Sequence, residues 1–65
     1  MTKKDYTVLA NFLIDAYKME IIEEYGQLRN INELLCNYLL KYYPNFNPYK
    51  FTKYIEKKLK EVGVR

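Results

Sequence analysis

Apolar residues recur at three- and four-residue spacing along most of the chain, which is the pattern of amphipathic helices. The first segment carries one main apolar stripe: Tyr6, Leu9, Ala10, Leu13, Ala16 and Tyr17. A second apolar flank beside it consists of Val8, Phe12 and Met19. Thr2 and Asp5 have the spacing of a capping box, and Gly26 is a typical residue for the end of a helix. The pattern predicts a helix over residues 3–25 that is apolar around most of its circumference.

The next stripe is the most regular in the chain: Ile31, Leu34, Leu35, Tyr38, Leu39 and Tyr42. Asn30 and Glu33 repeat the capping spacing just before it. Pro44 disfavours helical geometry in Tyr43, because its ring clashes with the backbone of the preceding residue. These features predict a second helix over residues 31–43, with this stripe packed in the core.

Residues 41–51, KYYPNFNPYKF, hold five aromatics and two prolines. Asn47 is a good N-cap, and Pro48 suits the first helical position, where its missing N–H costs nothing. Phe46 and Phe51 have the spacing of a hydrophobic staple. A third helix follows over residues 48–62, with a Gly63 stop and one apolar stripe: Phe51, Tyr54, Ile55, Leu59 and Val62. The sequence therefore predicts an all-α three-helix domain that comprises residues 1–65.

Composition narrows the class of protein further. A chain of 65 residues with one cysteine, Cys36, forms no internal disulfide, and a lone cysteine suits a reducing cytoplasm. The chain has no histidine, so the usual zinc and haem ligand sets are missing. Its charged N-terminal segment differs from a signal peptide, and no apolar run approaches the length of a membrane span. We expect a protein of the cytoplasm without a metal or other cofactor.

Two short segments resemble a group of small proteins encoded by bacteriophages and prophages. Those proteins open with Thr-Lys-Lys-Asp-Tyr and an aliphatic-Ala pair, as residues 2–6 and 9–10 do here. They close with Asn-Pro-Arg-Phe-Asp, two variable residues, a basic residue and Phe. Here that segment departs at Tyr43, Asn45 and Asn47 and ends in 50–51, Lys-Phe. The resemblance implies a small accessory phage protein in an infected or lysogenic host cell, and it implies no activity.

Catalytic and metal-binding chemistry finds little support. Cys36 has no cationic neighbour one helical turn away, so a semi-buried structural cysteine is the simpler interpretation than a reactive thiol. Glu20, Glu23 and Glu24 could bind a divalent cation, but neighbouring glutamates on a helix more often form a solvated face. The two glycines lie outside any phosphate-loop pattern. The sequence favours a non-enzymatic protein.

Charge divides the chain into two unlike halves. Residues 1–33 hold four basic and six acidic residues, a net of −2, whereas residues 34–65 hold seven basic and two acidic, a net of +5. Four lysines of the last helix share one face by their spacing: Lys50, Lys53, Lys57 and Lys60. Such a stripe can contact successive phosphates of a nucleic acid or an acidic partner, although it can equally be a solvated surface.

The aromatic load is the second surface signal. Eight tyrosines and three phenylalanines exceed what one small core encloses, and tyrosine is enriched at protein interfaces. In residues 41–51, the corner between the second and third helices, Tyr42, Tyr43 and Tyr49 remain as candidate interface residues. Our leading hypothesis is a phage-type accessory protein that binds another protein and self-associates as a homodimer or larger. The alternative is a small basic protein that binds nucleic acid through its last helix.

Overall fold

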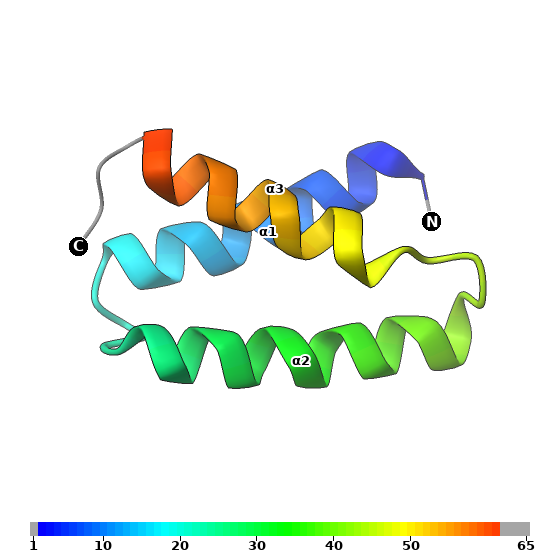
Figure 1. Ribbon diagram of the computed structural model, residues 1–65, viewed down its shortest axis with the longest axis horizontal. Helices are drawn as coiled ribbons and strands as arrows, with labels where there is room; N and C mark the ends of the chain where they lie inside the picture. The colour runs from blue at the N-terminus through cyan, green and yellow to red at the C-terminus, as the bar shows by residue number, and fades with distance from the viewer. Residues whose placement is uncertain (1, 62–65) are drawn as a thin grey trace.

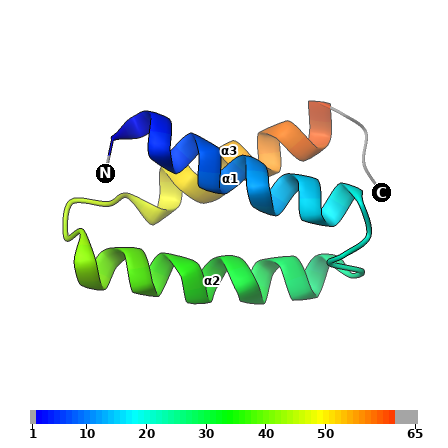
Figure 2. The same cartoon turned by 180° about the vertical axis from the view of Figure 1, so that it is seen from behind.

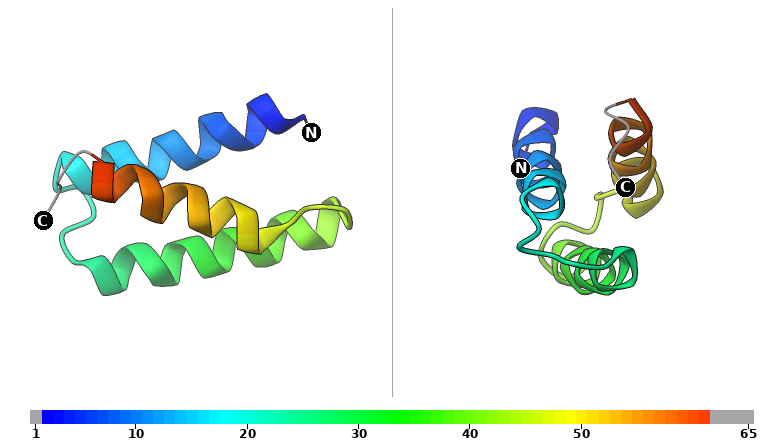
Figure 3. Two further views of the ribbon diagram at one scale, coloured as in Figure 1. Left: turned by 45° about the horizontal axis from the view of Figure 1, so that its top comes forward. Right: turned by 90° about the vertical axis from the view of Figure 1, so that its left-hand side faces the viewer.

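The structure, a computed structural model, describes residues 2–61, and every regular element in this range is an α-helix. The elements are α1 (Lys3–Lys18), α2 (Tyr25–Tyr42) and α3 (Pro48–Glu61). The helices α1 and α3 run side by side in the same direction, and α2 runs antiparallel beneath them (Figure 1). Viewed from one end, the three helices lie at the corners of a triangle (Figure 3, right). The prediction of an all-α three-helix fold is confirmed, while Val62 and Gly63 lie outside the described residues.

The first helix begins as the sequence predicts and ends seven residues earlier. The Thr2 N–H donates to Asp5 Oδ2 at 3.0 Å, and the Asp5 N–H donates to Thr2 Oγ1 at 3.3 Å, which completes the capping box. At the other end the Glu20 N–H donates to the Tyr17 carbonyl and the Ile21 N–H donates to the Ala16 carbonyl. This pair of bonds is a Schellman motif, which terminates helices.

The Schellman motif explains why the predicted end at residue 25 is wrong. Its C′ position requires a left-handed backbone, which glycine usually supplies. Here Glu20 occupies that position with a φ of 62°. The next glycine, Gly26, lies in the first turn of α2 instead of ending α1.

The second helix therefore begins six residues before its predicted start. Gln27 Oε1 accepts hydrogen bonds from the N–H groups of Glu23 and Glu24, both at 3.2 Å, and so satisfies two donors at the helix start. Asn30, the predicted cap, lies inside the helix. At the far end α2 stops at Tyr42, one residue from the predicted boundary.

The side of α2 that packs in the core also differs from the prediction. The buried residues of α2 are Leu28, Asn32, Cys36 and Leu39. Of the predicted stripe only Leu39 is buried, and Leu35 is partly buried. The remaining members are exposed: Ile31, Leu34, Tyr38 and Tyr42. Apolar residues cover a wider arc of α2 than α1 and α3 enclose, so part of that arc faces outward.

The corner and the third helix match the sequence interpretation. Asn47 Oδ1 accepts from the Lys50 N–H at 3.1 Å, as an N-cap does. The rings of Phe46 and Phe51 meet edge to face with their centroids 5.4 Å apart, and Tyr6 of α1 lies 4.8 Å from Phe46. The staple thus joins the corner to both α1 and α3. Among the described residues no helix combines the length and hydropathy needed to cross a membrane.

Candidate interaction surfaces

A broad exposed apolar surface lies on α1 and α2, which we call the α1/α2 apolar face. It is formed by six exposed side chains: Val8, Phe12, Ile31, Leu34, Tyr38 and Tyr42. Their exposed fractions run from 42% for Ile31 to 70% for Phe12. All six are uncharged, so the surface loses little hydration energy when another apolar surface covers it.

The packing of α3 places both halves of this face on the same side of the molecule. Lys3, Tyr6, Thr7 and Ala10 line a groove that α1 shares with α3. At 100° per residue, Phe12 lies on the opposite flank of α1, away from α3. The corresponding groove between α2 and α3 is lined by α2 residues on its other flank: Arg29, Glu33, Asn37 and Leu40. By the same helical spacing Tyr38 lies away from α3 on α2.

The flanks that turn away from α3 lie along the side of α1 and α2 that Figure 2 shows. The chain reverses between Lys18 and Tyr25, so residues equidistant from this turn lie at the same level. Phe12 is therefore level with Ile31, and Val8 is level with Leu35. Leu9 and Leu35, both partly buried, lie between the exposed face and the core. By this spacing the six residues lie toward the same side of the α1–α2 pair.

The size of the α1/α2 apolar face sets it apart from scattered apolar residues. A fully exposed aromatic side chain presents about 150–250 Å², and the three aliphatic side chains of the face present less. The exposed fractions, between 42% and 70%, then correspond to roughly 650 Å² on one copy. The largest apolar patch of a typical monomer measures about 300–600 Å² and often has a function.

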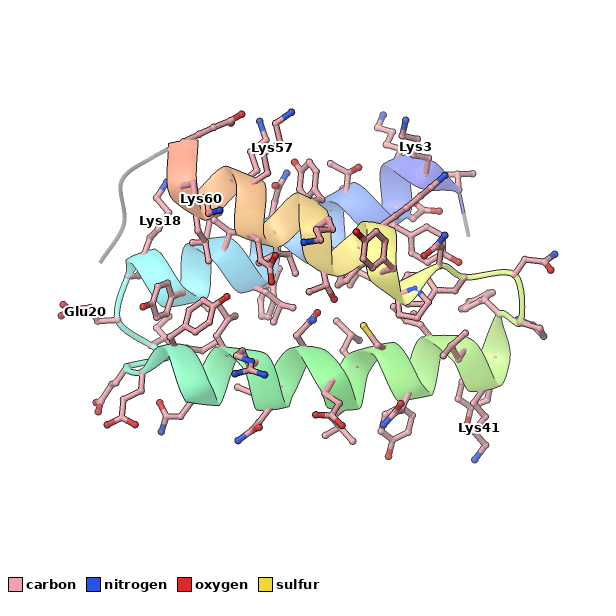
Figure 4. All side chains as sticks on the ribbon, in the orientation of Figure 1. Lys3, Lys18, Glu20, Lys41, Lys57 and Lys60 are labelled. Atoms are coloured by element: carbon pink, nitrogen blue, oxygen red, sulfur yellow. The ribbon has the colours of Figure 1, made fainter. Side chains whose placement is uncertain are left out.

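The four lysines of the predicted basic stripe lie together on the outer side of α3. Lys50, Lys53, Lys57 and Lys60 are all exposed, opposite the buried side of α3, which consists of Phe51, Ile55 and Leu59. Lys53 Nζ lies 3.7 Å from Glu56 Oε2 and 5.5 Å from the centre of the Tyr49 ring. We call these four residues the lysine face. In Figure 4, Lys57 extends from the upper side of the molecule and Lys41 of α2 from the lower side.

The three candidate interface tyrosines do not form one cluster. Tyr42, 65% exposed, belongs to the α1/α2 apolar face. Tyr49, 69% exposed, lies beside the lysine face, where Lys53 contacts its ring. Tyr43 is the C-cap residue of α2, and its N–H donates to the Leu39 carbonyl at 2.7 Å. Only Tyr42 is therefore part of a larger apolar surface.

The groove between α1 and α3 has a volume of about 370 Å³. Its floor is aromatic, with Tyr6, Phe46, Phe51 and Tyr54 among its lining residues. Lys3 and Lys50 also line it, one from each helix. The Tyr54 hydroxyl donates to Asn11 Oδ1 at 3.0 Å and ties the two helices together beside this groove.

Between α2 and α3 the core contains a small polar cluster that the sequence pattern did not reveal. Buried Asn32 donates from Nδ2 to Thr52 Oγ1 at 2.9 Å, and the Cys36 thiol lies 3.8 Å from Asn32 Oδ1. Burial raises the pKa of the Cys36 thiol, and a hydrogen bond with Thr52 opposes this in part. The thiol is thus buried and poorly ionised, as a structural cysteine is, and the cluster fixes how α2 sits against α3.

The acidic residues in the described part of the chain form no metal site. Within residues 2–61 no three His, Cys, Asp or Glu side chains gather into a group that could hold a metal ion. Glu24 is the N-cap residue of α2, and Glu20 closes the end of α1.

In comparisons with protein-family models, with curated proteins and with solved structures, nothing matches this chain.

Proposed function

We propose that this chain is a non-enzymatic accessory protein of phage type that acts by binding another protein and that also self-associates. The observation that carries the proposal is the α1/α2 apolar face. Its roughly 650 Å² approaches the 800 Å² that one partner contributes to a standard protein interface. Tyrosine and phenylalanine supply half of its residues, as is common at interface centres.

The binding mode follows from the shape of the surface. Two antiparallel helices, α1 and α2, form this side, with apolar side chains at three- and four-residue spacing along α2. An apolar surface on a pair of helices can accept the apolar side of an amphipathic helix, whose own side chains repeat at the same spacing. We therefore expect the partner to present a helix, and we place the encounter in the cytoplasm of an infected or lysogenic cell.

A capture experiment tests this function. The wild-type protein is immobilised and exposed to nuclease-treated bacterial lysate, in parallel with Tyr38→Asp and with a variant in which the lysine face is changed to glutamine. We expect the wild type to capture a partner from the lysate even after nuclease treatment. Tyr38→Asp should no longer capture this partner, whereas the glutamine variant should still capture it. Capture that disappears with nuclease, or that depends on the lysines alone, would contradict the proposal.

Binding of nucleic acid is the second candidate, and one observation favours it. Lys3 extends the basic surface from α3 onto α1, because it borders the same groove as Lys50. Against it, Lys53 lies within ion-pair distance of Glu56, and the stripe lacks the arginine and amide side chains that read base edges. Contacts would therefore be made mainly to phosphates.

Salt dependence separates this candidate from protein binding. Each phosphate neutralised by a lysine releases counterions, so affinity for duplex DNA falls steeply with salt. Changing the lysine face to glutamine lowers the net charge from +3 to −1, since four positive charges are removed. We expect feeble DNA binding at 0.15 M salt by fluorescence anisotropy. Tight binding there that the glutamine variant loses would favour the second candidate.

A further inference from the structure

From the geometry of the α1/α2 apolar face we infer that a second copy of this chain occupies it, in an antiparallel two-fold dimer. This inference rests on the proposed protein-binding function and names the occupant of its surface. The axis passes near Leu34 and Tyr38, perpendicular to α2. The α1–α2 pair of one copy then packs against the α1–α2 pair of the other as a four-helix bundle. Each α3 lies on the outside of this bundle.

The area of the face is sufficient for such a dimer. Two copies that each cover roughly 650 Å² bury about 1,300 Å² in total, within the range of about 1,200–2,000 Å² for specific interfaces. A two-fold interface joins the same patch on both copies, so the patch must be self-complementary. Six uncharged side chains meet this condition without like-charge repulsion, whereas the lysine face would repel its own copy.

Charge distribution along α2 selects the antiparallel arrangement. Exposed Glu24 lies at the N-terminal end of α2, and exposed Lys41 lies in its last turn. In an antiparallel pair about this axis Lys41 of one copy lies level with Ile31 of the other, well away from the other Lys41. A parallel pair would place Lys41 beside Lys41 and would align the two helix dipoles unfavourably. The larger side chains at one end, Tyr38 and Tyr42, also then cover the smaller Ile31 of the second copy.

The two-fold arrangement closes on itself. A face that binds its own copy is covered in the dimer, so it cannot recruit a third chain at the same time, and a partner helix would have to replace the second copy. The lysine faces of the two copies lie on opposite outer sides and repel further dimers. We therefore expect a dimer and no larger assembly.

Two tyrosines give a matched pair of variants for the test. Tyr38 is 54% exposed on the α1/α2 apolar face, and Tyr49 is 69% exposed outside it. Sedimentation equilibrium between 1 and 200 µM should give the wild type a mass approaching twice 7.9 kDa at the upper concentrations. Tyr38→Asp should raise the dimer dissociation constant at least 100-fold, while Tyr49→Asp should change it less than threefold. Circular dichroism verifies that both variants keep their helices.

Several results would overturn the inference. A wild type that stays at 7.9 kDa up to 200 µM rules out the dimer and self-association, yet capture of a foreign partner that Tyr38→Asp abolishes would still support the protein-binding part of the proposed function. Equal effects of the two tyrosine variants would place the interface elsewhere. Masses above the dimer would contradict the closed two-fold arrangement.

A disulfide experiment tests the axis even if Tyr38→Asp fails to fold. In a Cys36→Ala background, Leu34→Cys places a thiol close to the proposed axis and Tyr49→Cys places one far from it. Mild oxidation should link the Leu34→Cys copies at least tenfold faster than the Tyr49→Cys copies. Equal rates would contradict the axis.

Discussion

The outer sides of α2 and α3 are alike in exposure and opposite in chemistry. Lysines occupy the outer side of α3, and their ammonium groups hold water strongly, so covering that side carries a large desolvation cost. The outer side of α2 presents aliphatic and aromatic side chains beside a few polar ones such as Gln27 and Lys41, and covering its apolar part releases water at little cost. One small domain thus has one side that resists contact and one that favours it. This asymmetry favours the α1/α2 apolar face over the lysine face as a surface for contact with another protein.

The two sides of α2 give the sharpest test of this comparison and the largest expected effect. Leu28 is 2% exposed on the inner side, and Leu34 is 58% exposed on the outer side. Leu28→Ala should lower the free energy of unfolding by about 2–5 kcal/mol, because it leaves a cavity in the core. Leu34→Ala should change it by less than about 0.5 kcal/mol at protein concentrations below the dimer range.

Urea denaturation followed by circular dichroism measures both leucine variants under the same conditions. The stability of a dimer rises with protein concentration, so the titrations are repeated at several concentrations. A loss for Leu34→Ala as large as that for Leu28→Ala at low concentration would show that the outer stripe is packed within the single chain, as the sequence pattern alone predicted.

Sequence reasoning succeeded where each signal was local. The capping box of Thr2, the N-cap of Asn47 and the staple of Phe46 all depend on residues a few positions apart, and all three are confirmed. The exposure of the lysine face also followed from spacing, because α3 has one narrow apolar stripe and a charged opposite side. In such a helix only one side can enter the core.

Sequence reasoning failed where the choice depended on tertiary packing. The apolar arc of α2 includes both Leu28 and Leu34, and only the positions of α1 and α3 decide which of them is enclosed. A helix start set at residue 31 left Leu28 outside the helix and concealed its role. The exposed surplus on α1 was expected from Val8 and Phe12, but its continuity with α2 requires the arrangement of all three helices.

The boundary between α1 and α2 also differs from the predicted one, and two substitutions involving glycine test its position. Glu20→Gly should stabilise the protein by about 1 kcal/mol, because glycine adopts the left-handed φ of 62° without steric conflict. Gly26→Ala should stabilise it by up to about 1 kcal/mol, because Gly26 is helical and an added Cβ meets nothing within 4 Å. Thermal unfolding measures both. Destabilisation by Gly26→Ala would instead indicate that Gly26 ends the first helix.

The last test concerns Cys36, which reports on the inner side of α2. Burial raises its pKa above the ordinary value of 9.0, so the folded state favours the neutral thiol. The stabilisation by this neutral form is complete below pH 9.0 and decreases as the pH rises toward the higher folded pKa.

The Cys36 thiol of the unfolded chain ionises at a lower pH than that of the folded chain, and it reacts with iodoacetamide as thiolate. We therefore expect alkylation at pH 8 to be at least tenfold slower in native protein than in urea. Tyr38→Asp should leave the native rate unchanged, because Tyr38 lies on the other side of the helix. Fast alkylation of the native protein would mean that the side of α2 with Cys36 is open to solvent and that the inner and outer sides have been assigned in reverse.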